Sequence, residues 1–592
     1  MNKVPQQSEA WRSYSKKPAI LWLFIGLTLA HVVVIIVLSS VPPVSRDALT
    51  HHLAVPKLYL SHGGIYEIPS IAFSYYPMNL DLLYLLALYC GNDIAPKFIH
   101  FSFALLCAGL IFGYLKKRLD TLWGLVGALM FLSLPVVVKL SITVYVDLGL
   151  IFFSTAALIF FMRWIEENFR IKYLALSAIF CGLALGTKYN GLLVFMLLAL
   201  FVPFVYARQQ KATDAAHNSR SGNRRIYTTT RSLGYGLLFI LISLLIYSPW
   251  FIRNMVWTHN PVYPLYKSWF TTQEKNTAVD QNESSQMNTR PDRGKKRSPL
   301  SPFLSRKILY NEAWWQIVLV PLRIFYQAKD DNPQYFDGKL HPYLLILPFF
   351  AFFWPRQTPP IVKIEKQILL AFSLLYLMIT FFSVDMRIRY VAPIIPPLVI
   401  LTVFGLHAIV TLVADKYRPA TPGLKIALIS IVLLYFFSTN AAYVSRQFKI
   451  VDPFSYISGR LDRDAYIEKF RPEYRVYVFA NQHLAKDDKI LGLFLGNRLY
   501  YSDREISFGT GFFRKTVNRA QSADTIASNL NKSGFTHLII RIDIFKTWAR
   551  AVFDARQKER LQHFLDSNIR LLFAKSGYAL YQLKAQSETD NL

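Results

Sequence analysis

Long apolar segments alternate with short polar ones over most of the chain. The first apolar run, residues 18–41, is long enough to cross a bilayer, which takes about 20 residues. Comparable runs continue as far as residue 442. They predict about eleven membrane spans, at residues 18–41, 95–115, 121–140, 146–164, 173–187, 190–206, 233–252, 341–355, 367–383, 390–413 and 424–442. The segment 77–90 is apolar but short and begins at a proline, so we expect an interfacial helix there.

Basic residues mark alternate ends of these segments. Lys and Arg are in excess on the cytoplasmic side of membrane proteins, and the N-terminal residues 1–17 are basic. We therefore expect residues 1–17 in the cytoplasm. The same rule places Lys116-Lys117-Arg118 inside and the loops 42–94 and 253–340 outside.

The pattern changes at about residue 445, where helix and strand signals begin to alternate. Residues 445–592 predict a small extracytoplasmic α/β domain. We expect helices at 472–485, 522–532 and 548–565, and strands at 489–495, 498–501, 536–541, 569–574 and 578–583. The polar segment 271–307 reads as a flexible loop.

Composition agrees with a membrane protein. Of the 592 residues, 53% are hydrophobic and 17% are charged, whereas about 25% charged residues is typical of soluble domains. The net charge of +29 lies mostly between spans, which favours anionic headgroups and lipid phosphates over nucleic acid as partners. Cys90, Cys107 and Cys181 lie in or beside apolar runs, and their spacing indicates no disulfide framework.

Ionisable and polar residues gather at the outer ends of the predicted spans. One snorkelling side chain means little, but a set of such groups at one membrane face indicates a site. The set comprises Asp47, His51, His52, Lys57, Asp147, Lys188, Tyr189, Arg253, Asn254, Asp385, Arg387, Arg389 and Tyr390.

Five of these residues carry the candidate chemistry. Asp47 follows the first span and is placed to accept a proton, while Asp147 begins an apolar run as a helix cap or as a second acid. Lys188 stands in a tight turn, where it either snorkels or contacts phosphate. Arg253 and Arg389 are the stronger phosphate ligands, because a guanidinium binds phosphate bidentately, although an interfacial anchor explains each as well.

The other residues of the set are candidate substrate contacts, namely His51, His52, Lys57, Tyr189, Asn254 and Tyr390. The paired histidines lack regular metal-ligand spacing, so we expect no metal site. A divalent metal is the one cofactor left open. The chain has no nucleotide fingerprint, P-loop or GxSxG motif, which argues against a sugar nucleotide or ATP.

Several short stretches, taken in order, resemble the GT-C superfamily of polytopic glycosyltransferases. The resemblance is strongest to the bacterial branch related to protein mannosyltransferases, lipid A aminoarabinose transferase and rhizobial lipopolysaccharide transferases. The matching stretches are Asp47 to Pro56, Lys57-Leu58-Tyr59, Gly63-Gly64, Tyr76-Pro77, Val146-Asp147, Leu185 to Tyr189, Trp250 to Asn254, Asn260 to Pro264, Arg389-Tyr390 with Pro393 and Pro396, and Asn481 to Leu484. Many relatives have a second acid directly after the first-loop Asp, where this chain has Ala48.

The resemblance implies a transmembrane glycosyltransferase domain at 18–442 that uses a polyprenyl-phosphate sugar donor, with inversion at the anomeric carbon. Asp47 would be the general base toward a hydroxyl of a lipid, glycan or protein acceptor. Lys188, Arg253 and Arg389 would neutralise the departing phosphate. The reaction would take place at the outer face of a bacterial cytoplasmic membrane.

Two other functions fit parts of the pattern. A lipid-linked sugar flippase would also need cations and a lipid groove, but charged residues deep in several spans or repeated halves are expected of it, and neither is present. A non-catalytic envelope assembly protein would use the outer domain for binding, and Asp47 would then be dispensable.

Overall fold

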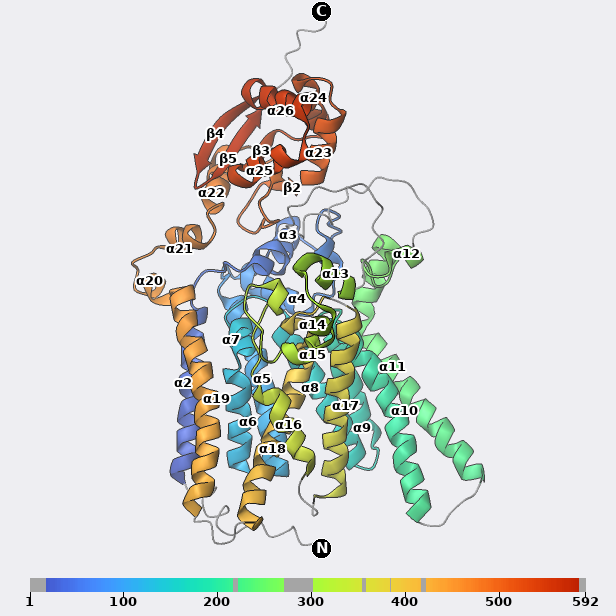
Figure 1. Ribbon diagram of the computed structural model, residues 1–592. Helices are drawn as coiled ribbons and strands as arrows, with labels where there is room; N and C mark the ends of the chain where they lie inside the picture. Colours follow the sequence, from blue (N-terminus) through green and yellow to red (C-terminus); the bar gives the residue numbers. More distant parts are fainter. Residues whose placement is uncertain are drawn as a thin grey trace, which may run out of the picture.

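A bundle of roughly parallel helices carries a small sheet domain at one end (Figure 1). The computed structural model describes residues 18–216, 222–270, 302–353, 358–383, 385–416 and 422–584. The predicted flexible loop 271–307 lies mostly outside these residues. The helical polytopic class with a C-terminal α/β domain is confirmed.

Seven helices in the described residues are long and apolar enough to cross a membrane. They lie in α2 (Pro18–Ser39), α5 (Ala95–Arg118), α8 (Asp147–Glu166), α10 (Gly191–Ala216), α11 (Gly222–Thr258), α17 (Pro360–Ser383), and η5 (Ile388–Ile394) continued by α18 (Ile395–Lys416). The helices α6 (Thr121–Ser133) and α7 (Pro135–Ser141) form an eighth candidate, bent by 65° at a proline, which cannot continue the hydrogen-bond ladder.

The remaining predicted spans also fall on helices, but these helices are not among the seven or the bent pair. The total of about eleven spans therefore stays a prediction. These helices are α9 (Ile171–Leu185), α16 (Tyr343–Phe353) and α19 (Pro422–Val451). The predicted interfacial segment forms α4 (Asn79–Tyr89), whose 11 residues are too few to span a bilayer.

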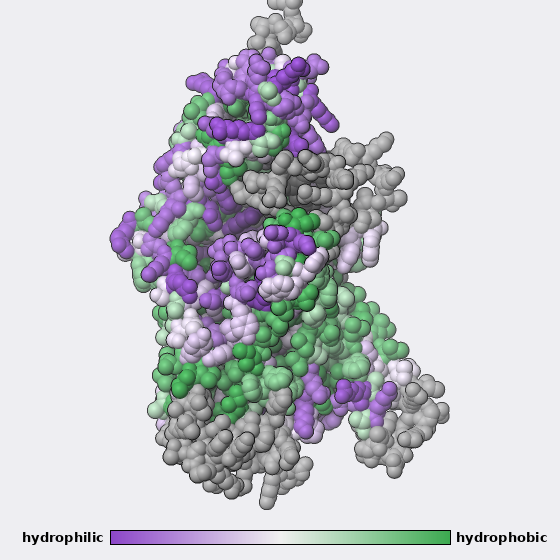
Figure 2. All heavy atoms as spheres, viewed as in Figure 1, coloured by the Kyte–Doolittle hydropathy of each residue, from purple (hydrophilic) through white to green (hydrophobic). Residues whose placement is uncertain are grey.

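Apolar side chains cover the outside of the bundle and fill its centre. In Figure 2 hydrophobic surface dominates the helical part, and hydrophilic surface dominates the sheet domain. The Ile388–Thr411 span is 83% buried, whereas α2 is 6% buried and exposes Trp22 and Leu29. Helices α16 and α18 touch closely, because a Cβ at Gly405 would lie 2.0 Å from the carbonyl oxygen of Leu347. Helix α18, which follows Arg389 in the chain, is therefore packed tightly against α16.

Short helices cover the end of the bundle that carries the sheet domain, the end that the charge pattern predicts to lie outside. The first outer loop forms a π-helix η1 (Ala48–His52), α3 (Ala54–His62) and η2 (Ala72–Tyr75), and then enters α4. In Figure 1 α3 lies between the bundle and the sheet domain. The second outer loop contributes α12 (Lys267–Phe270), α13 (Pro302–Tyr310), α14 (Trp314–Val318), α15 (Val320–Arg323) and η4 (Pro333–Tyr335).

The C-terminal domain is a five-stranded mixed sheet in the order β2-β1-β3-β5-β4. Strands β2, β1 and β3 are parallel, and β3, β5 and β4 are antiparallel. The strands are β1 (Lys489–Leu493), β2 (Glu505–Phe508), β3 (His537–Arg541), β4 (Ile569–Lys575) and β5 (Tyr578–Leu583). The helices of this part are α20 (Pro453–Ile457), α21 (Arg463–Phe470), α22 (Tyr474–His483), α23 (Thr510–Arg519), α24 (Ala523–Lys532), α25 (Ile542–Val552) and α26 (Ala555–Ser567).

Two predicted elements of this domain differ in the structure. The predicted helix 548–565 is two helices, because Asp554 caps a new helix by accepting from the backbone N–H of Gln557 at 2.8 Å. The predicted strand at 498–501 is wrong. Its Leu499 and Tyr500 N–H groups donate to the carbonyl oxygen of Leu49, at 3.0 and 3.1 Å, and not to a neighbouring strand.

This contact is part of an interface between the C-terminal domain and the first outer loop. Lys57 Nζ donates to the carbonyl oxygens of Tyr500 and Ser502 at 2.8 and 3.0 Å, and to Asp503 Oδ1 at 2.7 Å. Further contacts join Tyr501 Oη to the Pro43 carbonyl at 2.8 Å and Arg463 Nη2 to Asp93 Oδ2 at 2.5 Å. The domain is thus fixed directly above the loop that begins at Asp47.

Candidate active site

Asp47 forms an ion pair with Arg389. Asp47 immediately precedes η1, Arg389 lies in η5, and Nη1 of the arginine donates to Oδ2 of the carboxylate. The side chains are 20% and 18% exposed, so the pair is reachable from outside. Burial raises the pKa of Asp47 more than any single neighbour changes it, but the charge and hydrogen bond of Arg389, together with His51 and His52, outweigh burial and hold the pKa below its ordinary value. Asp47 is therefore ionised, as a proton acceptor must be.

A second ion pair joins Lys188 to Asp147. Lys188 Nζ lies 2.6 Å from Asp147 Oδ1, and the carboxylate is 1% exposed. Asp147 is the first residue of α8, where the helix dipole favours an anion, but Val146 occupies the cap position. Asp147 Oδ2 is buried and has no hydrogen-bond partner among the described residues. Asp147 thus compensates Lys188 rather than capping its helix.

Tyrosine rings bring the two pairs together. The Tyr390 ring centroid lies 5.7 Å from both Lys188 Nζ and the guanidinium carbon of Arg389. Arg389 also lies 5.4 Å from the Tyr145 ring centroid. Tyr390 therefore contacts one cation of each pair, within the range of cation–π attraction.

The paired histidines lie beside this cluster but are held by other groups. His51 Nδ1 lies 2.8 Å from Thr50 Oγ1, and His52 Nδ1 lies 2.7 Å from Asp81 Oδ1. Burial and the neighbouring His52 lower the pKa of His51, so His51 is neutral at pH 7. No group of three metal-ligand side chains exists among the described residues, so the donors present do not fit a metal centre.

Arg253 lies in a second, aromatic part of the site. Its guanidinium carbon lies 4.7 and 5.0 Å from the ring centroids of Trp250 and Trp257, and Nη2 donates to the Tyr76 carbonyl at 3.1 Å. Its Nη1 is buried without a hydrogen-bond partner, and Arg253 pairs with no carboxylate in the described part of the chain. Tyr76 in turn packs against Tyr189, at a centroid distance of 5.0 Å. Arg253 is thus connected through Tyr76 to Tyr189, the residue that follows Lys188.

Other residues that were predicted to contact substrate form hydrogen bonds within the protein instead. Asn254 is fully buried, and its Nδ2 donates to the Tyr75 carbonyl at 2.9 Å and to Tyr189 Oη at 3.1 Å. Tyr189 Oη donates to the Tyr263 carbonyl at 2.7 Å, so both side chains fasten outer loops to the bundle. Lys57 binds the C-terminal domain. Two residues of the sequence-derived set lie in other ion pairs, Asp385 with Arg306 at 3.3 Å and Arg387 with Asp337 at 3.7 Å.

Sequence reasoning missed three residues that organise the site. Tyr145 packs on Arg389, and Asp81 orients His52. His100 accepts the N–H of Leu148 at 2.9 Å at the start of α8. Tyr145 had a sequence signal, because it stands two residues before Asp147, whereas Asp81 and His100 lie inside apolar helical runs that conceal them.

Comparisons with known proteins agree with this architecture. The family model described as dolichyl-phosphate-mannose-protein mannosyltransferase matches residues 84–216, which include Asp147 and Lys188. Crystal structures of ArnT from Cupriavidus metallidurans superpose over nearly the whole of both chains. The apo form covers 95% of this chain and 98% of ArnT, with a TM-score of 0.51 and 13% identity. The form bound to undecaprenyl phosphate covers 95% and 97%, with a TM-score of 0.55 and 12% identity. The chain has the GT-C glycosyltransferase fold.

A further match to the GT-C fold comes from an archaeon. The Archaeoglobus fulgidus oligosaccharyltransferase, tethered to an acceptor peptide with an NVT sequon, has a TM-score of 0.53 at 10% identity. The match covers 92% of this chain and 72% of the oligosaccharyltransferase. The comparison with curated protein sequences gave no match. At 10–13% identity, these structural matches show that the chain shares the fold of these proteins.

Proposed function

We propose that the chain is an inverting glycosyltransferase that moves a hexosyl or pentosyl group from a polyprenyl-phosphate donor to a hydroxyl acceptor. The observation that carries the proposal is the convergence of one partly exposed carboxylate, Asp47, with the cations Arg389 and Lys188 at the outer end of the bundle. Such a set supplies both a proton acceptor and the charge to stabilise a departing phosphate. The ArnT structure with undecaprenyl phosphate supports the donor class.

The donor phosphate would be held by Arg389, Lys188 and Arg253. Arg253 has no carboxylate partner in the described residues and a buried free Nη1, so it is the cation that phosphate reaches without breaking an ion pair. The positive charge of Arg389 would then be shared between Asp47 and the phosphate. Because Arg389 is what holds the pKa of Asp47 low, this exchange raises that pKa and makes the carboxylate a stronger base.

In the transfer step the acceptor hydroxyl gives its proton to Asp47, and its oxygen forms a bond to the anomeric carbon. The bond from that carbon to the phosphate oxygen breaks on the opposite face, and its electron pair leaves with the polyprenyl phosphate. No covalent enzyme intermediate is needed, so the configuration inverts. The proposed step uses these side chains alone, because the described residues contain no set of ligands for a divalent metal.

The site would lie at the outer face of a bacterial cytoplasmic membrane, with the C-terminal domain on the same side. Membrane lipids, the lipid-linked donor and a lipid, glycan or protein acceptor would be its partners, and nucleic acid would not. The bonds of Leu499 and Tyr500 to Leu49, and of Lys57 to the Tyr500 carbonyl, support a role for the C-terminal domain in presenting the acceptor.

The test is Asp47→Asn. Asparagine is nearly isosteric, so folding should persist, but it cannot take the proton, and turnover should fall by about 10²–10⁴-fold. The measurement is transfer of labelled sugar from a synthetic polyprenyl-phosphate donor to an envelope fraction by purified protein in proteoliposomes.

The matched control is Asp566→Asn, since Asp566 is an exposed acid on α26 that bonds Gln562 of the same helix. Donor binding should be preserved in both variants. Near-normal turnover by Asp47→Asn would remove Asp47 as the base.

A further inference from the structure

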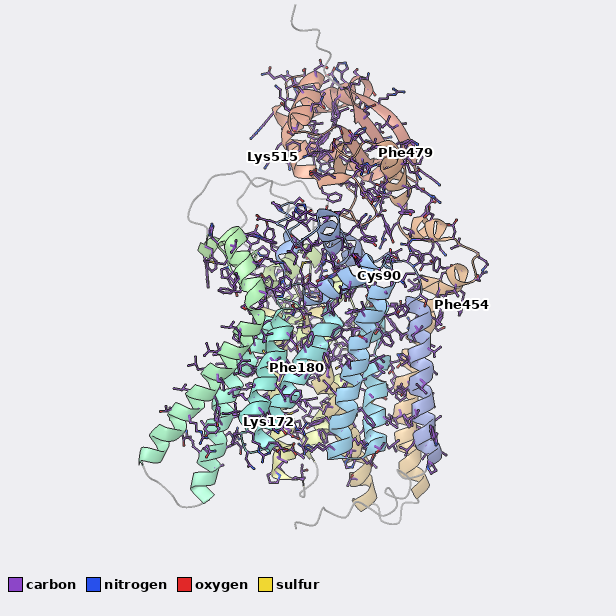
Figure 3. All side chains as sticks on the ribbon, turned by 180° about the vertical axis from the view of Figure 1, so that it is seen from behind. Cys90, Lys172, Phe180, Phe454, Phe479 and Lys515 are labelled. Carbon is purple, nitrogen blue, oxygen red and sulfur yellow. The ribbon has the colours of Figure 1, made fainter. Side chains whose placement is uncertain are left out.

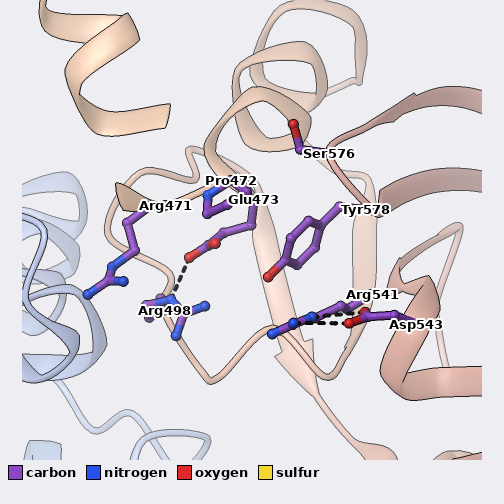
Figure 4. A pocket seen from close by; sticks show the side chains of 9 residues that line it. Arg471, Pro472, Glu473, Arg498, Arg541, Asp543, Ser576 and Tyr578 are labelled. Carbon is purple, nitrogen blue, oxygen red and sulfur yellow. Dashed lines mark hydrogen bonds and ion pairs between the residues drawn. The ribbon is translucent and has the colours of Figure 1, made fainter. Parts of the chain in front are cut away.

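The C-terminal domain contains a cavity of about 490 Å³ that the proposed transfer does not use. Its walls include Arg471, Arg498, Arg541, Glu473, Asp543 and Tyr578, which come from the segment before α22, the segment before Tyr500, the ends of the inner strands β3 and β5, and the start of α25 (Figure 4). This volume is within the range of small-molecule sites, roughly 300–1,000 Å³.

The cavity has an excess of positive charge. Arg498 pairs with Glu473, and Arg541 donates to both oxygens of Asp543 at 2.9 and 3.0 Å. Arg471 forms no ion pair with any described residue. Its Nη1 donates to the Phe470 carbonyl at 2.8 Å, and its Nε is buried without a partner. Burial, with the adjacent charge of Arg498, lowers the pKa of Arg471, as expected of a cation that lacks an anion.

The cavity is connected to the transfer site. Arg498 directly precedes Leu499, whose N–H donates to the carbonyl of Leu49 in η1, the helix that Asp47 immediately precedes. In Figure 4 the Arg471 side chain points away from the sheet toward the ribbon of the first outer loop. A ligand that contacts Arg471 therefore lies on the Asp47 side of the domain.

We propose that this cavity binds an oxyanion of the acceptor, a phosphate ester or carboxylate carried on a saccharide, while a hydroxyl of the same acceptor reaches Asp47. The guanidinium of Arg471 binds the anion, because a planar fork with free N–H groups matches phosphate and carboxylate oxygens. Tyr578 lines the same cavity with its side chain largely buried. This inference rests on the proposed transferase activity and narrows its acceptor to an acidic glycan.

Binding of defined probes tests the anion site. Full-length protein in lipid nanodiscs is titrated calorimetrically with glucose 6-phosphate, glucuronate and neutral glucose. One or both acidic sugars should bind and glucose should not, and the tighter acidic sugar identifies the anion. Arg471→Gln should weaken binding about tenfold or more, the effect of losing a charge-assisted hydrogen bond.

Two further variants keep the test decisive. Ser576→Asp adds a negative charge to the cavity wall, and its left-handed backbone (φ 53°) is one that Asp tolerates, so binding should weaken without misfolding. Arg514→Gln, an exposed arginine on α23, should bind the probes as the wild type does. Equal binding of glucose and the acidic sugars, or wild-type affinity in both Arg471→Gln and Ser576→Asp, would overturn the anion site.

Transfer assays separate this inference from the proposed function. The bound probe should inhibit labelled transfer to envelope glycans, and about tenfold more probe should be needed with Arg471→Gln, while donor binding is unchanged. Asp47→Asn should lose transfer but keep probe binding. Transfer that bound probe does not slow would overturn the acceptor assignment alone. Absence of transfer by the wild type, with probe binding intact, would overturn the proposed function and the acceptor assignment with it.

Discussion

Asp47 and Arg389 neutralise each other, and this pairing has a chemical cost for a general base. A carboxylate whose pKa is held low takes a proton poorly, and the best catalytic pKa lies near the working pH. In the proposed mechanism, a donor phosphate that binds near Arg389 would remove this restraint. The pair would then link donor occupancy to base strength.

This link predicts a pH effect. In the free enzyme the low pKa of Asp47 keeps it ionised, so kcat/KM should show no acid limb from this residue above about pH 5. Arg389→Gln removes the charge that lowers the pKa, while burial still raises it, so the acid limb should move to higher pH. The measurement is kcat/KM against pH for both proteins. An acid limb at the same pH in both proteins would mean that Arg389 does not affect the titration of Asp47.

The second ion pair predicts a stability effect. Lys188→Met leaves Asp147 buried and uncompensated, and breaking a buried pair costs about 3–5 kcal/mol. Lys188→Met with Asp147→Asn removes both charges, so the double variant should unfold at a higher temperature than the single one. Thermal unfolding in detergent measures both. A double variant less stable than Lys188→Met would mean that Asp147 has another partner.

The sequence alone identified the four residues of the two ion pairs, but not which carboxylate pairs with which cation. Asp47, Asp147, Lys188 and Arg389 are visible because ionisable groups at the ends of apolar runs are costly unless they are used. Which carboxylate meets which cation depends on how η1, η5 and the α9–α10 turn pack, and no local pattern encodes that packing.

At the scale of elements, the segment 498–501 shows how tertiary contacts override propensity. Its Leu-Tyr-Tyr composition is typical of a strand. In the fold its backbone N–H groups bond to Leu49 and its Tyr500 carbonyl accepts from Lys57. The hydrogen bonds that would define a strand are used to dock one domain on another, and sequence periodicity cannot distinguish the two uses. Spans were predicted better, because bilayer thickness fixes their length and hydropathy.

The interface between the C-terminal domain and the first outer loop predicts that backbone amides in it are protected from hydrogen exchange. Lys57→Ala removes three hydrogen bonds to the 500–503 segment, so the amides of Leu499 and Tyr500 should exchange faster, by about fivefold for each roughly 1 kcal/mol lost. Hydrogen–deuterium exchange with peptide readout measures this. Lys489→Ala, which removes an exposed ion pair with Glu505 inside the C-terminal domain, is the control and should leave these amides unchanged. Equal exchange in Lys57→Ala and the wild type would mean that this contact does not hold the domain in place.

At the scale of the whole molecule, the site and the C-terminal domain lie at one end of the bundle. Figure 3 shows Lys515 in the sheet domain and Cys90 at the same end, with Lys172 toward the other end of the helices. The charge pattern of the sequence assigns that end to the extracytoplasmic side.

A labelling experiment checks this orientation. In a Cys90→Ser background, which removes the one exposed native thiol of the described residues, Lys515→Cys should react with a membrane-impermeant maleimide in intact spheroplasts. Lys172→Cys should react only after lysis. The reverse pattern would invert the topology and place the site in the cytoplasm.

The bond between Leu49 and the 499–500 segment also has a consequence for biogenesis. Leu49 is made before its partners, which follow several hundred residues later in the chain, after the last of the long apolar helices. Through most of synthesis the loop that begins at Asp47 therefore lacks its cover. A chain that ended before residue 499 would lack this cover, so the proposed sugar transfer would begin only after the 499–500 segment has been made and has bound Leu49.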